Sequence, residues 1–335
     1  MSWLFYLFIF SLSLSLTWAL HRFRLSSMML DVPNHRSSHV NPTPRGGGLA
    51  FVFCFSLALI FLWNYKLIGF LPAISLLGTS FFIAFIGFMD DLHGVSVEWR
   101  LLGHFIAASL ALYGLGGMAE INLFYWTLPA GLLTSAMAVL YLVWLLNLYN
   151  FMDGIDGLAA IEAITVCIGG ALLYYFLNQP MAAILPLTLA VSVAGFLIWN
   201  FPPARIFMGD AGSGFLGFVL GLLSIQAAII ETNFFWAWLI LLGVFIVDAT
   251  VTLLRRIIQG EVIFEAHRSH AYQHASRFYG RHRPVTLAVL VINLLWLFPM
   301  AFAVGFNFIN GSLGMLIAYF PLFFLVLKFK AGLRE

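Results

Sequence analysis

Charged side chains are scarce in this sequence, and their scarcity excludes a soluble globular protein. Only 9% of the 335 residues are Asp, Glu, Lys or Arg, whereas 62% are hydrophobic. Soluble domains carry about 25% charged residues. Apolar runs close to the roughly 20 residues that a bilayer-crossing helix needs recur along the whole chain. Because a spanning segment must satisfy its own backbone hydrogen bonds, the composition predicts an all-α, polytopic integral membrane protein.

Cysteines, polar linkers and repeats are also rare or missing. Cys54 and Cys167 lie in separate apolar stretches, which argues against a disulfide framework or a cysteine zinc site. The sequence has no polar tract long enough for a soluble domain, so residues 1–335 are predicted to form a single integral-membrane domain. It also has no clear internal repeat, which disfavours a transporter. Residues 1–20 lack a basic start and a cleavage site, so we expect a retained first span.

Eleven apolar segments are candidate spans. They cover residues 2–20, 46–63, 67–88, 101–117, 127–147, 158–176, 182–199, 214–230, 235–254, 286–306 and 312–327. If the loop after the first span is cytoplasmic and the sides alternate, every Lys and Arg except Lys66 lies on the cytoplasmic side. Basic loops stay on that side of a membrane. The sequence therefore predicts about 11 transmembrane helices, with the N-terminus outside and the C-terminus in the cytoplasm.

The polar residues gather in short islands, and all of these islands fall on the predicted cytoplasmic side. A carboxylate beside a bilayer is costly, so several on one side indicate a functional site. Asp90 and Asp91 end the third candidate span. Adjacent carboxylates repel each other unless they face a cation or share a proton, so this pair suits metal binding and proton transfer. The alternative is a solvated loop that begins with two acids.

The second island contains Asn147, Asn150, Asp153 and Asp156 at a spacing of three residues. Residues three apart share one face of a helix. Their oxygen-only ligands suit Mg²⁺ rather than zinc, and backbone amides at a helix end can hold a phosphate. Helix caps and turns are the alternative use of the same residue types.

The third island runs from Asn200 to Ser213, with two prolines that break a helix and with glycines around Asp210. Gly209 permits close backbone approach, so Asp210 suits a metal ligand beside a phosphate. The island is not a P-loop, because the Gly-Lys-Ser/Thr ending is missing. A re-entrant turn capped by Asp210 and Ser213 is the alternative.

The fourth island, EAHRSHAYQH from Glu265 to His274, lies in the most basic part of the chain. The spacing of His267, His270 and His274 places them on one face if the segment is helical. The surrounding arginines can hold a diphosphate by charge-assisted hydrogen bonds. Topology alone would explain the arginines, but it explains the histidines poorly.

Several further residues are weaker candidates. The first inside loop is DVPNHRSSHVNPTPRGGG. Either it contacts a nucleotide or phosphate, or it is only a flexible basic loop. The residues that could make such a contact are Asn34, His35, Arg36, His39 and Arg45. Glu162, Asp248 and His104 lie inside candidate spans. We expect each to face the protein interior beside a polar partner, without direct catalysis.

Together, five segments resemble the polyprenyl-phosphate N-acetylhexosaminyl-1-phosphate transferases of the MraY and WecA type, glycosyltransferase family 4. They are DVPNHRSSHVNPTPRGGG, MDDLHG, NLYNFMDGIDGLAA, FPPARIFMGDAGSGFLG and EAHRSHAYQ, from Asp31 to about Gln273. The similarity is greatest to the WecA and WbpL branch, which initiates lipopolysaccharide O-antigen or related cell-envelope glycans. It implies that undecaprenyl phosphate attacks the β-phosphate of a UDP-N-acetylhexosamine, and that UMP leaves. It also implies a need for Mg²⁺, with Mn²⁺ as an alternative ion, and residence in the bacterial inner membrane.

The resemblance implies roles for individual residues. Asp210, Asp90 and Asp91 match metal ligands, and one member of the Asp pair would deprotonate the lipid phosphate. The implied catalytic set is Asp90, Asp91, Asp153, Asp156, His267 and His270, and the implied substrate contacts are Asn147, Asn150, Asn200, Arg205, Gly209, Ser213, Arg268 and Arg45. Many members carry a run of histidines where this chain has His267-Arg268-Ser269-His270, so Arg268 is expected to share the phosphate contact.

Other features stay open at this point. The donor sugar is N-acetylglucosamine, N-acetylgalactosamine or a 6-deoxy sugar such as N-acetylfucosamine or N-acetylquinovosamine, and attack is direct or passes through a phospho-enzyme. Expected partners are the two substrates and membrane lipids, without nucleic acid; a homodimer is left open. A UbiA-type prenyltransferase would carry two NDxxDxxxD-like motifs, which the sequence lacks. A transporter or channel would place charges along a path near the bilayer midplane.

Overall fold

Helices build almost the whole molecule in the computed structural model, which describes residues 2–23, 30–31, 42–261 and 267–333. In those residues the strands form only two short antiparallel hairpins, β1 (Leu30–Asp31) with β2 (Thr43–Pro44) and β3 (Ile121–Leu123) with β4 (Trp126–Leu128). The predicted all-α class is confirmed. The helices in chain order are α1 (Trp3–Arg22), α2 (Gly48–Asn64), α3 (Phe70–His93), α4 (Val97–Leu115), α5 (Leu132–Met152), α6 (Leu158–Phe176), α7 (Ile184–Asn200), α8 (Asp210–Ile230), α9 (Thr232–Leu241), α10 (Gly243–Ile258), α11 (Ala271–Tyr279), α12 (Arg283–Ile292), the π-helical η2 (Asn293–Leu297), α13 (Phe298–Gly305) and α14 (Gly311–Lys328).

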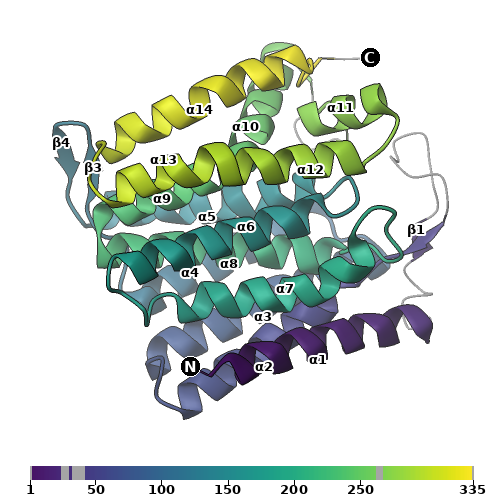
Figure 1. Ribbon diagram of the computed structural model, residues 1–335, viewed down its shortest axis with the longest axis horizontal. Coiled ribbons are helices and arrows are strands. Elements are labelled where there is room, and N and C mark those ends of the chain that lie inside the picture. Colours follow the sequence, from purple (N-terminus) through teal and green to yellow (C-terminus); the bar gives the residue numbers. More distant parts are fainter. Residues whose placement is uncertain (1, 24–29, 32–41, 262–266, 334–335) are drawn as a thin grey trace.

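The long helices lie side by side along one direction, as in a membrane bundle (Figure 1). Among the described residues, seven segments are long and apolar enough to cross a membrane: α1, α3, α5, α6, α8, the α12–α13 segment and α14. The bent pair of α9 and α10 brings the number to eight, and α2 and α7 are apolar but only 17 residues long each. The polytopic architecture is confirmed, whereas the count of eleven spans and the sides of the termini stay predictions.

The segment predicted as one span over residues 235–254 is not a straight helix. It bends by 71° between α9 and α10. A bend frees backbone groups that lipid cannot satisfy, so protein partners must take their place. The hydroxyl of Tyr319 donates to the carbonyl of Leu239 over 2.7 Å, and the backbone amide of Phe245 faces the carboxyl group of Glu162. Side chains from distant helices therefore stabilise a break that residues 235–254 alone do not signal.

Helix α8 is the centre of the bundle. The most apolar stretch of α8 is 83% buried, more than that of any other candidate span, and the helix packs against α3 on one side and α5 on another. The first residues of α8 lie at the end of the molecule where α3 and α5 finish and where β1 and α11 are found (Figure 1). The polar islands at these helix ends are thereby brought to one end of the bundle.

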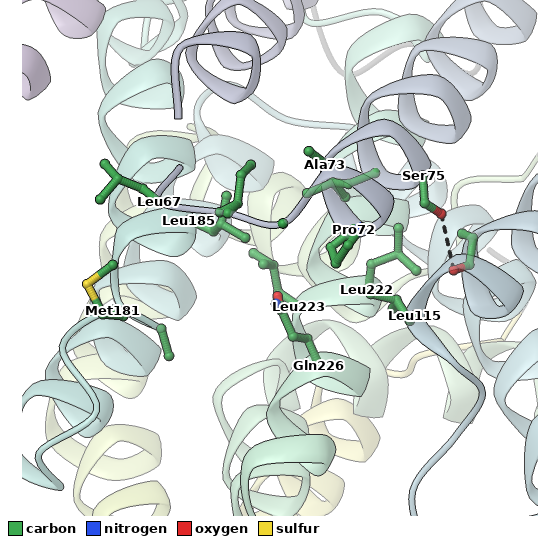
Figure 2. Close-up of a pocket in the computed structure, with 15 residues that line it drawn as sticks. Leu67, Pro72, Ala73, Ser75, Leu115, Met181, Leu185, Leu222, Leu223 and Gln226 are labelled. Atoms are coloured by element: carbon green, nitrogen blue, oxygen red, sulfur yellow. Dashed lines mark hydrogen bonds between the residues drawn. The ribbon is translucent and has the colours of Figure 1, made fainter. Parts of the chain in front are cut away.

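The opposite end carries the β3–β4 hairpin and an apolar cavity (Figures 1 and 2). The lining of this cavity includes Pro72, Leu115, Leu185 and Leu222, with the amide of Gln226 among its few polar groups. A diphosphate needs charged or hydrogen-bonding partners. This cavity therefore does not suit the chemistry that the sequence predicts.

Candidate active site

The last turn of α3 touches the backbone at the start of α8, and this contact builds the site. A Cβ atom on Gly87 would lie 2.5 Å from the carbonyl carbon and oxygen of Asp210, so only glycine permits the approach. Gly87 is one helical turn before the Asp90-Asp91 pair. The packing of two helix backbones thus places the acids of the first and third islands together, as the sequence predicts.

Asp91 is the acid of this pair with a carboxylate oxygen that has no hydrogen-bond donor among the described residues. Its side chain is 1% exposed, and Oδ2 accepts a hydrogen bond of 3.2 Å from the backbone N–H of Ala211. Oδ1 lies 3.9 Å from Nη1 of Arg45 and has no hydrogen-bond donor among the residues that the structure describes. Gly209 holds φ at +80°, and a Cβ there would lie 2.7 Å from Asp91 Oδ2, so the turn before α8 also requires glycine.

Both carboxylate oxygens of Asp90, by contrast, are used by the protein. Oδ1 accepts from the backbone N–H of Val95 over 2.8 Å, and Oδ2 pairs with the guanidinium group of Arg100. The same guanidinium group lies 3.8 Å from Oδ2 of Asp210. Arg100 therefore belongs to the site, although the sequence analysis considered it only for the topology. Its position in the first turn of the helix that follows Asp90-Asp91 could have indicated this role.

Arg45 reaches the site through backbone pairing between two islands. The N–H groups of Gly47 and Gly48 donate to the carbonyls of Phe207 and Met208, each over 2.9 Å, and the N–H of Phe207 donates to Pro44 over 2.8 Å. This pairing fixes the end of the first inside loop beside the start of α8. The other candidates of that loop, Asn34, His35, Arg36 and His39, lie outside the described residues.

Asn150 connects α5 to the same turn. Its Nδ2 donates to Oγ of Ser213 over 3.0 Å, and this hydroxyl donates to the carbonyl of Gly209 over 3.2 Å. One turn earlier, Nδ2 of Asn147 donates to Val143 over 2.7 Å. The spacing of three does place both asparagines on the face of α5 that lines a small polar cavity. That cavity is lined by Asp90, Arg100, His104, Asn147, Asn150 and Asp210, together with Ile83, Ile86, Gly87, Leu146 and Gly214.

Asp153 follows directly after the last residue of α5. Loss of contact with water is the largest cause that raises the pKa of Asp153 well above its usual range, and the neighbouring carboxylates of Asp210 and Asp91 raise it further. The positive charge of Arg45 opposes this shift only in part. Asp153 therefore lies near enough to the carboxylates of Asp91 and Asp210 to feel their charge. A cation bound there would favour the ionised form of Asp153.

Asp156 is held differently, in contacts that join three segments. Its Oδ2 accepts from the N–H of Ala204 over 3.0 Å, its Oδ1 lies 3.1 Å from Nδ1 of His282, and its backbone carbonyl accepts from the Thr286 hydroxyl over 2.9 Å. No sequence pattern had indicated a role for His282 or Thr286. These contacts favour a bracing role for Asp156, while its predicted catalytic role stays a prediction.

Asn200 is the last residue of α7 and Arg205 lies in the loop between α7 and α8, and their side chains have different surroundings. Oδ1 of Asn200 accepts from Gly157 and its Nδ2 donates to Ile206, both over 3.0 Å, so its buried amide joins two loops. The guanidinium group of exposed Arg205 lies 5.3 Å from the centre of the Trp199 ring. The structure does not bring either side chain to the Asp91 carboxylate through a direct contact, and their predicted substrate contacts stay predictions.

The histidine segment is only partly helical. Helix α11 begins at Ala271 with His270 as its N-cap, so His267 precedes the helix and the prediction of one helical face for all three histidines is wrong. The rings of His267 and His270 nevertheless stack with centroids 4.9 Å apart. The hydroxyl of Tyr272 donates to Phe151 over 2.9 Å and ties this segment to the end of α5. The carbonyl of the neighbouring Arg268 accepts from Arg277.

His267 is an uncharged ring at neutral pH. Burial is the largest cause that lowers the pKa of His267 to about 3, and its neighbours His270 and Arg256 lower it further. Its Nδ1 lies 3.0 Å from the Ser269 hydroxyl. His267 can therefore form hydrogen bonds to a substrate but does not supply positive charge to a diphosphate.

The donor set fits a magnesium ion that is shared with substrate. In the described part of the chain, no three His, Cys, Asp or Glu side chains converge into a complete metal cluster. Mg²⁺, however, is usually held by one or two carboxylates, with waters and substrate phosphates completing its shell. Asp91 offers a buried oxygen without a donor, and the Asp210 side chain is 31% exposed. These two acids are the residues that would hold the ion.

Comparison with known proteins agrees with this geometry. The model of the family named glycosyl transferase family 4 matches residues 73–228. A decaprenyl-phosphate N-acetylglucosaminephosphotransferase of Mycolicibacterium smegmatis is 32% identical over 81% of this chain and 73% of its own length. A probable undecaprenyl-phosphate N-acetylglucosaminyl 1-phosphate transferase of Bacillus subtilis is 29% identical over 80% of this chain and 75% of its own length. A phospho-N-acetylmuramoyl-pentapeptide-transferase of Chlamydia trachomatis is 32% identical over 54% of this chain and 60% of its own length.

Proposed function

Since the chain belongs to glycosyl transferase family 4, we propose that it transfers an N-acetylhexosamine 1-phosphate from a UDP-sugar to a polyprenyl phosphate. The observation that carries the proposal is the convergence of Asp91, Asp210 and Arg45 at one end of an apolar bundle. A site at such a boundary can meet a soluble nucleotide sugar and a lipid whose phosphate stays at headgroup depth. The names of the similar proteins of Bacillus subtilis and Mycolicibacterium smegmatis support the same class of reaction.

The proposed reaction is one phosphoryl transfer. An oxygen of the lipid phosphate forms a bond to the β-phosphorus of the UDP-sugar, and the bond from that phosphorus to the bridging oxygen breaks. The products are a polyprenyl-diphospho-sugar and UMP. Such transfers depend mainly on positioning and charge neutralisation. Mg²⁺, when bound, would neutralise charge on the diphosphate, and Arg45 and Arg100 supply further positive charge beside the carboxylates.

The structure favours different tasks for the two adjacent acids. Asp90 is occupied by Val95 and Arg100, so we assign it to holding Arg100 between the acids. Asp91 has a buried oxygen, 3.9 Å from Arg45, that has no hydrogen-bond donor among the described residues. We therefore assign to Asp91 the contact with the ion or the removal of a proton from the lipid phosphate. A proton acceptor has to lie within hydrogen-bond reach of the proton that it removes, and both oxygens of Asp90 are already used by Val95 and Arg100.

The finer part of the proposal concerns substrate identity and cellular role. We propose undecaprenyl phosphate as the acceptor, the bacterial inner membrane as the location and the initiation of O-antigen or a related cell-envelope glycan as the role. The motif resemblance supports this part, and the similarity to a protein named for undecaprenyl phosphate agrees with the acceptor. N-acetylglucosamine, N-acetylgalactosamine and their 6-deoxy relatives are the candidate donor sugars.

The test is UMP release by purified protein in detergent, with undecaprenyl phosphate, Mg²⁺ and a panel of UDP-N-acetylhexosamines. We expect UMP with at least one donor, loss of activity when EDTA removes the ion, and loss in Asp210→Asn. Removal of one preorganised electrostatic group from an active site costs roughly 10²- to 10³-fold in rate, and we expect a loss of this order. A folded protein that releases UMP from none of the donors contradicts the proposal and brings the prenyltransferase and transporter hypotheses forward.

A further inference from the structure

Asp248 is a buried acid on α10 that directly contacts the histidine segment. Its side chain is 3% exposed. Oδ1 accepts from the N–H of Ala271 over 2.9 Å and from the Thr252 hydroxyl over 3.1 Å, and Oδ2 accepts from the N–H of Tyr272 over 3.0 Å. Nδ1 of His270 lies 3.4 Å from Oδ1. A carboxylate from one helix therefore caps the first turn of another helix and contacts its N-cap imidazole.

This arrangement determines which nitrogen of His270 carries a proton. Two backbone N–H groups and a hydroxyl already use Asp248 as an acceptor. A carboxylate that accepts from all its neighbours can contact Nδ1 only if Nδ1 is the donor. The bond that one ring nitrogen makes fixes the state of the other. Nε2 is consequently the ring position that His270 can present to another molecule.

Nε2 of His270 is buried and has no hydrogen-bond partner among the residues that the structure describes. A buried polar atom without a partner is rare and calls for an explanation, such as a ligand. The ring is held in a stack, with the His267 ring centroid at 4.9 Å and the Tyr272 ring centroid at 5.6 Å. Tyr272 in turn donates to Phe151, two residues before Asp153. The imidazole is therefore fixed in place beside the end of α5, with the ring centroids of His270 and Phe151 6.4 Å apart.

We propose that Asp248 is a positioning residue for the transfer reaction: it keeps the proton of His270 on Nδ1 and thereby directs Nε2 to a polar group of the bound UDP-sugar. The inference rests on the proposed function for the identity of the ligand. It assigns a task to an acid inside a predicted span, where the sequence indicated only an interior polar partner. Asp248 itself does not touch the substrate; it acts through His270.

The first experiment is steady-state kinetics of Asp248→Asn in the UMP-release assay. The amide keeps the size of the side chain but replaces one acceptor oxygen with a donor, which favours the wrong tautomer of His270. We expect kcat/KM for the UDP-sugar to fall about 10- to 100-fold, as is typical when the partner that orients a functional histidine is removed. The KM for undecaprenyl phosphate should stay unchanged. Asp248→Glu, which keeps the acceptor, should recover part of the loss.

Glu162→Gln is the matched control. Glu162 is also a buried acid inside a helix, but it accepts from Asn293 over 2.7 Å rather than from His270. Glu162 also faces the backbone amide of Phe245 on α10, and glutamine keeps an oxygen acceptor for that contact. Because the substitution removes a buried acid that does not contact the histidine segment, activity should stay within about twofold of wild type. An equal loss in both variants would mean that any buried acid matters for folding alone, and would overturn the proposal.

A double-mutant cycle separates positioning from simple helix capping. In a His270→Ala background, Asp248→Asn should lower kcat/KM no further, because both changes remove the same contact. If the two losses multiply, Asp248 acts through the stability of α11 and not through His270, and the proposal is wrong. Size-exclusion profiles and melting temperatures of all variants show whether each protein folds.

A spectroscopic test does not depend on activity. In protein labelled with ¹⁵N-histidine, the His270 signals are those missing from the His270→Ala spectrum. Magic-angle-spinning NMR should show Nδ1 of His270 protonated in the wild type and unprotonated in Asp248→Asn. An unprotonated Nδ1 in the wild type overturns the proposal even if Asp248→Asn does not fold. If Nδ1 is protonated but the wild type releases no UMP from any donor, the proposed function fails while the Asp248–His270 contact stands.

Discussion

The same three helices line two cavities, one at each end of the bundle, and the cavities differ in chemistry. At one end α3, α4 and α8 contribute Asp90, Arg100 and Asp210 to a polar cavity. At the other end they contribute Ala73, Leu115 and Leu222 to an apolar one (Figure 2). The helix packing is continuous between the two ends, so the fold alone does not determine where the chemistry occurs. The side chains in the terminal turns of each helix determine its place.

The comparison also shows how the polar end tolerates its charges. A lone carboxylate beside lipid is costly, but two acids at this end have a partner for each oxygen. Asp90 has Arg100 and a backbone N–H, and Asp156 has His282 and a backbone N–H. Asp91 differs, because one of its oxygens has no hydrogen-bond donor among the described residues. We expect the largest effects of substitution where the protein leaves such an acceptor for another molecule.

Substitution of the two adjacent acids should therefore have unequal effects, and these should be the largest in the molecule. Asp91→Asn should lower kcat about 10²- to 10⁴-fold, the range for loss of a general base. Asp90→Asn should cost about 10- to 100-fold, because it removes a hydrogen bond to a charged partner worth roughly 1.5–3 kcal/mol. Initial rates of UMP release over a Mg²⁺ series measure both. Equal losses, or a greater loss in Asp90→Asn, would contradict the division of tasks between them.

Two glycines of α3 provide the next test, because one lies at the polar end and the other does not. A Cβ on Gly87 would meet the backbone of Asp210 at 2.5 Å, whereas a Cβ on Gly78 would meet nothing within 4 Å. Gly87→Ala should cost about 1–3 kcal/mol through overpacking, and activity should fall up to about 10²-fold if the acids move apart by 1 Å.

Gly78→Ala is the control on the same helix. It should leave activity unchanged and stabilise the helix by roughly 0.5–1 kcal/mol. Thermal unfolding and UMP release, measured side by side, separate the two effects. Similar activities for the two variants would mean that the close contact of α3 with α8 does not position Asp91.

The sequence predicted which polar residues lie together at this end, because they are local signals. The acids at helix ends, the asparagines at a spacing of three and the glycines around Asp210 can each be recognised without knowledge of a partner. Residues whose use depends on another helix were not predictable in the same way. Arg100 joins the site because α4 returns beside α3, and Asp248 caps α11 across a segment of more than 20 residues. No periodicity along α10 encodes that contact.

The errors have the same origin. The 71° bend between α9 and α10 is supported by Tyr319, which belongs to α14. Residues 235–254 considered by themselves therefore resemble one continuous span. The predicted helical face of the histidines failed because helix α11 begins at Ala271, where the Asp248 carboxylate accepts its first N–H groups. In both cases a side chain far away in sequence decides where a helix begins or ends. Local pattern determines which segments are helical, and tertiary partners determine their limits.

The smallest effect should be found at the apolar end, and it completes the comparison. Gln226 lines the cavity of Figure 2, on the same helix whose first residue is Asp210. Gln226→Leu should change kcat and KM by no more than about twofold, because a substitution away from special features usually shifts free energies by less than 0.5 kcal/mol. The same UMP assay measures it, with Asp210→Asn as the opposite extreme on one helix. A large loss in Gln226→Leu would show that the two ends of α8 are coupled, and the apolar cavity would then have to be counted as part of the catalytic machinery.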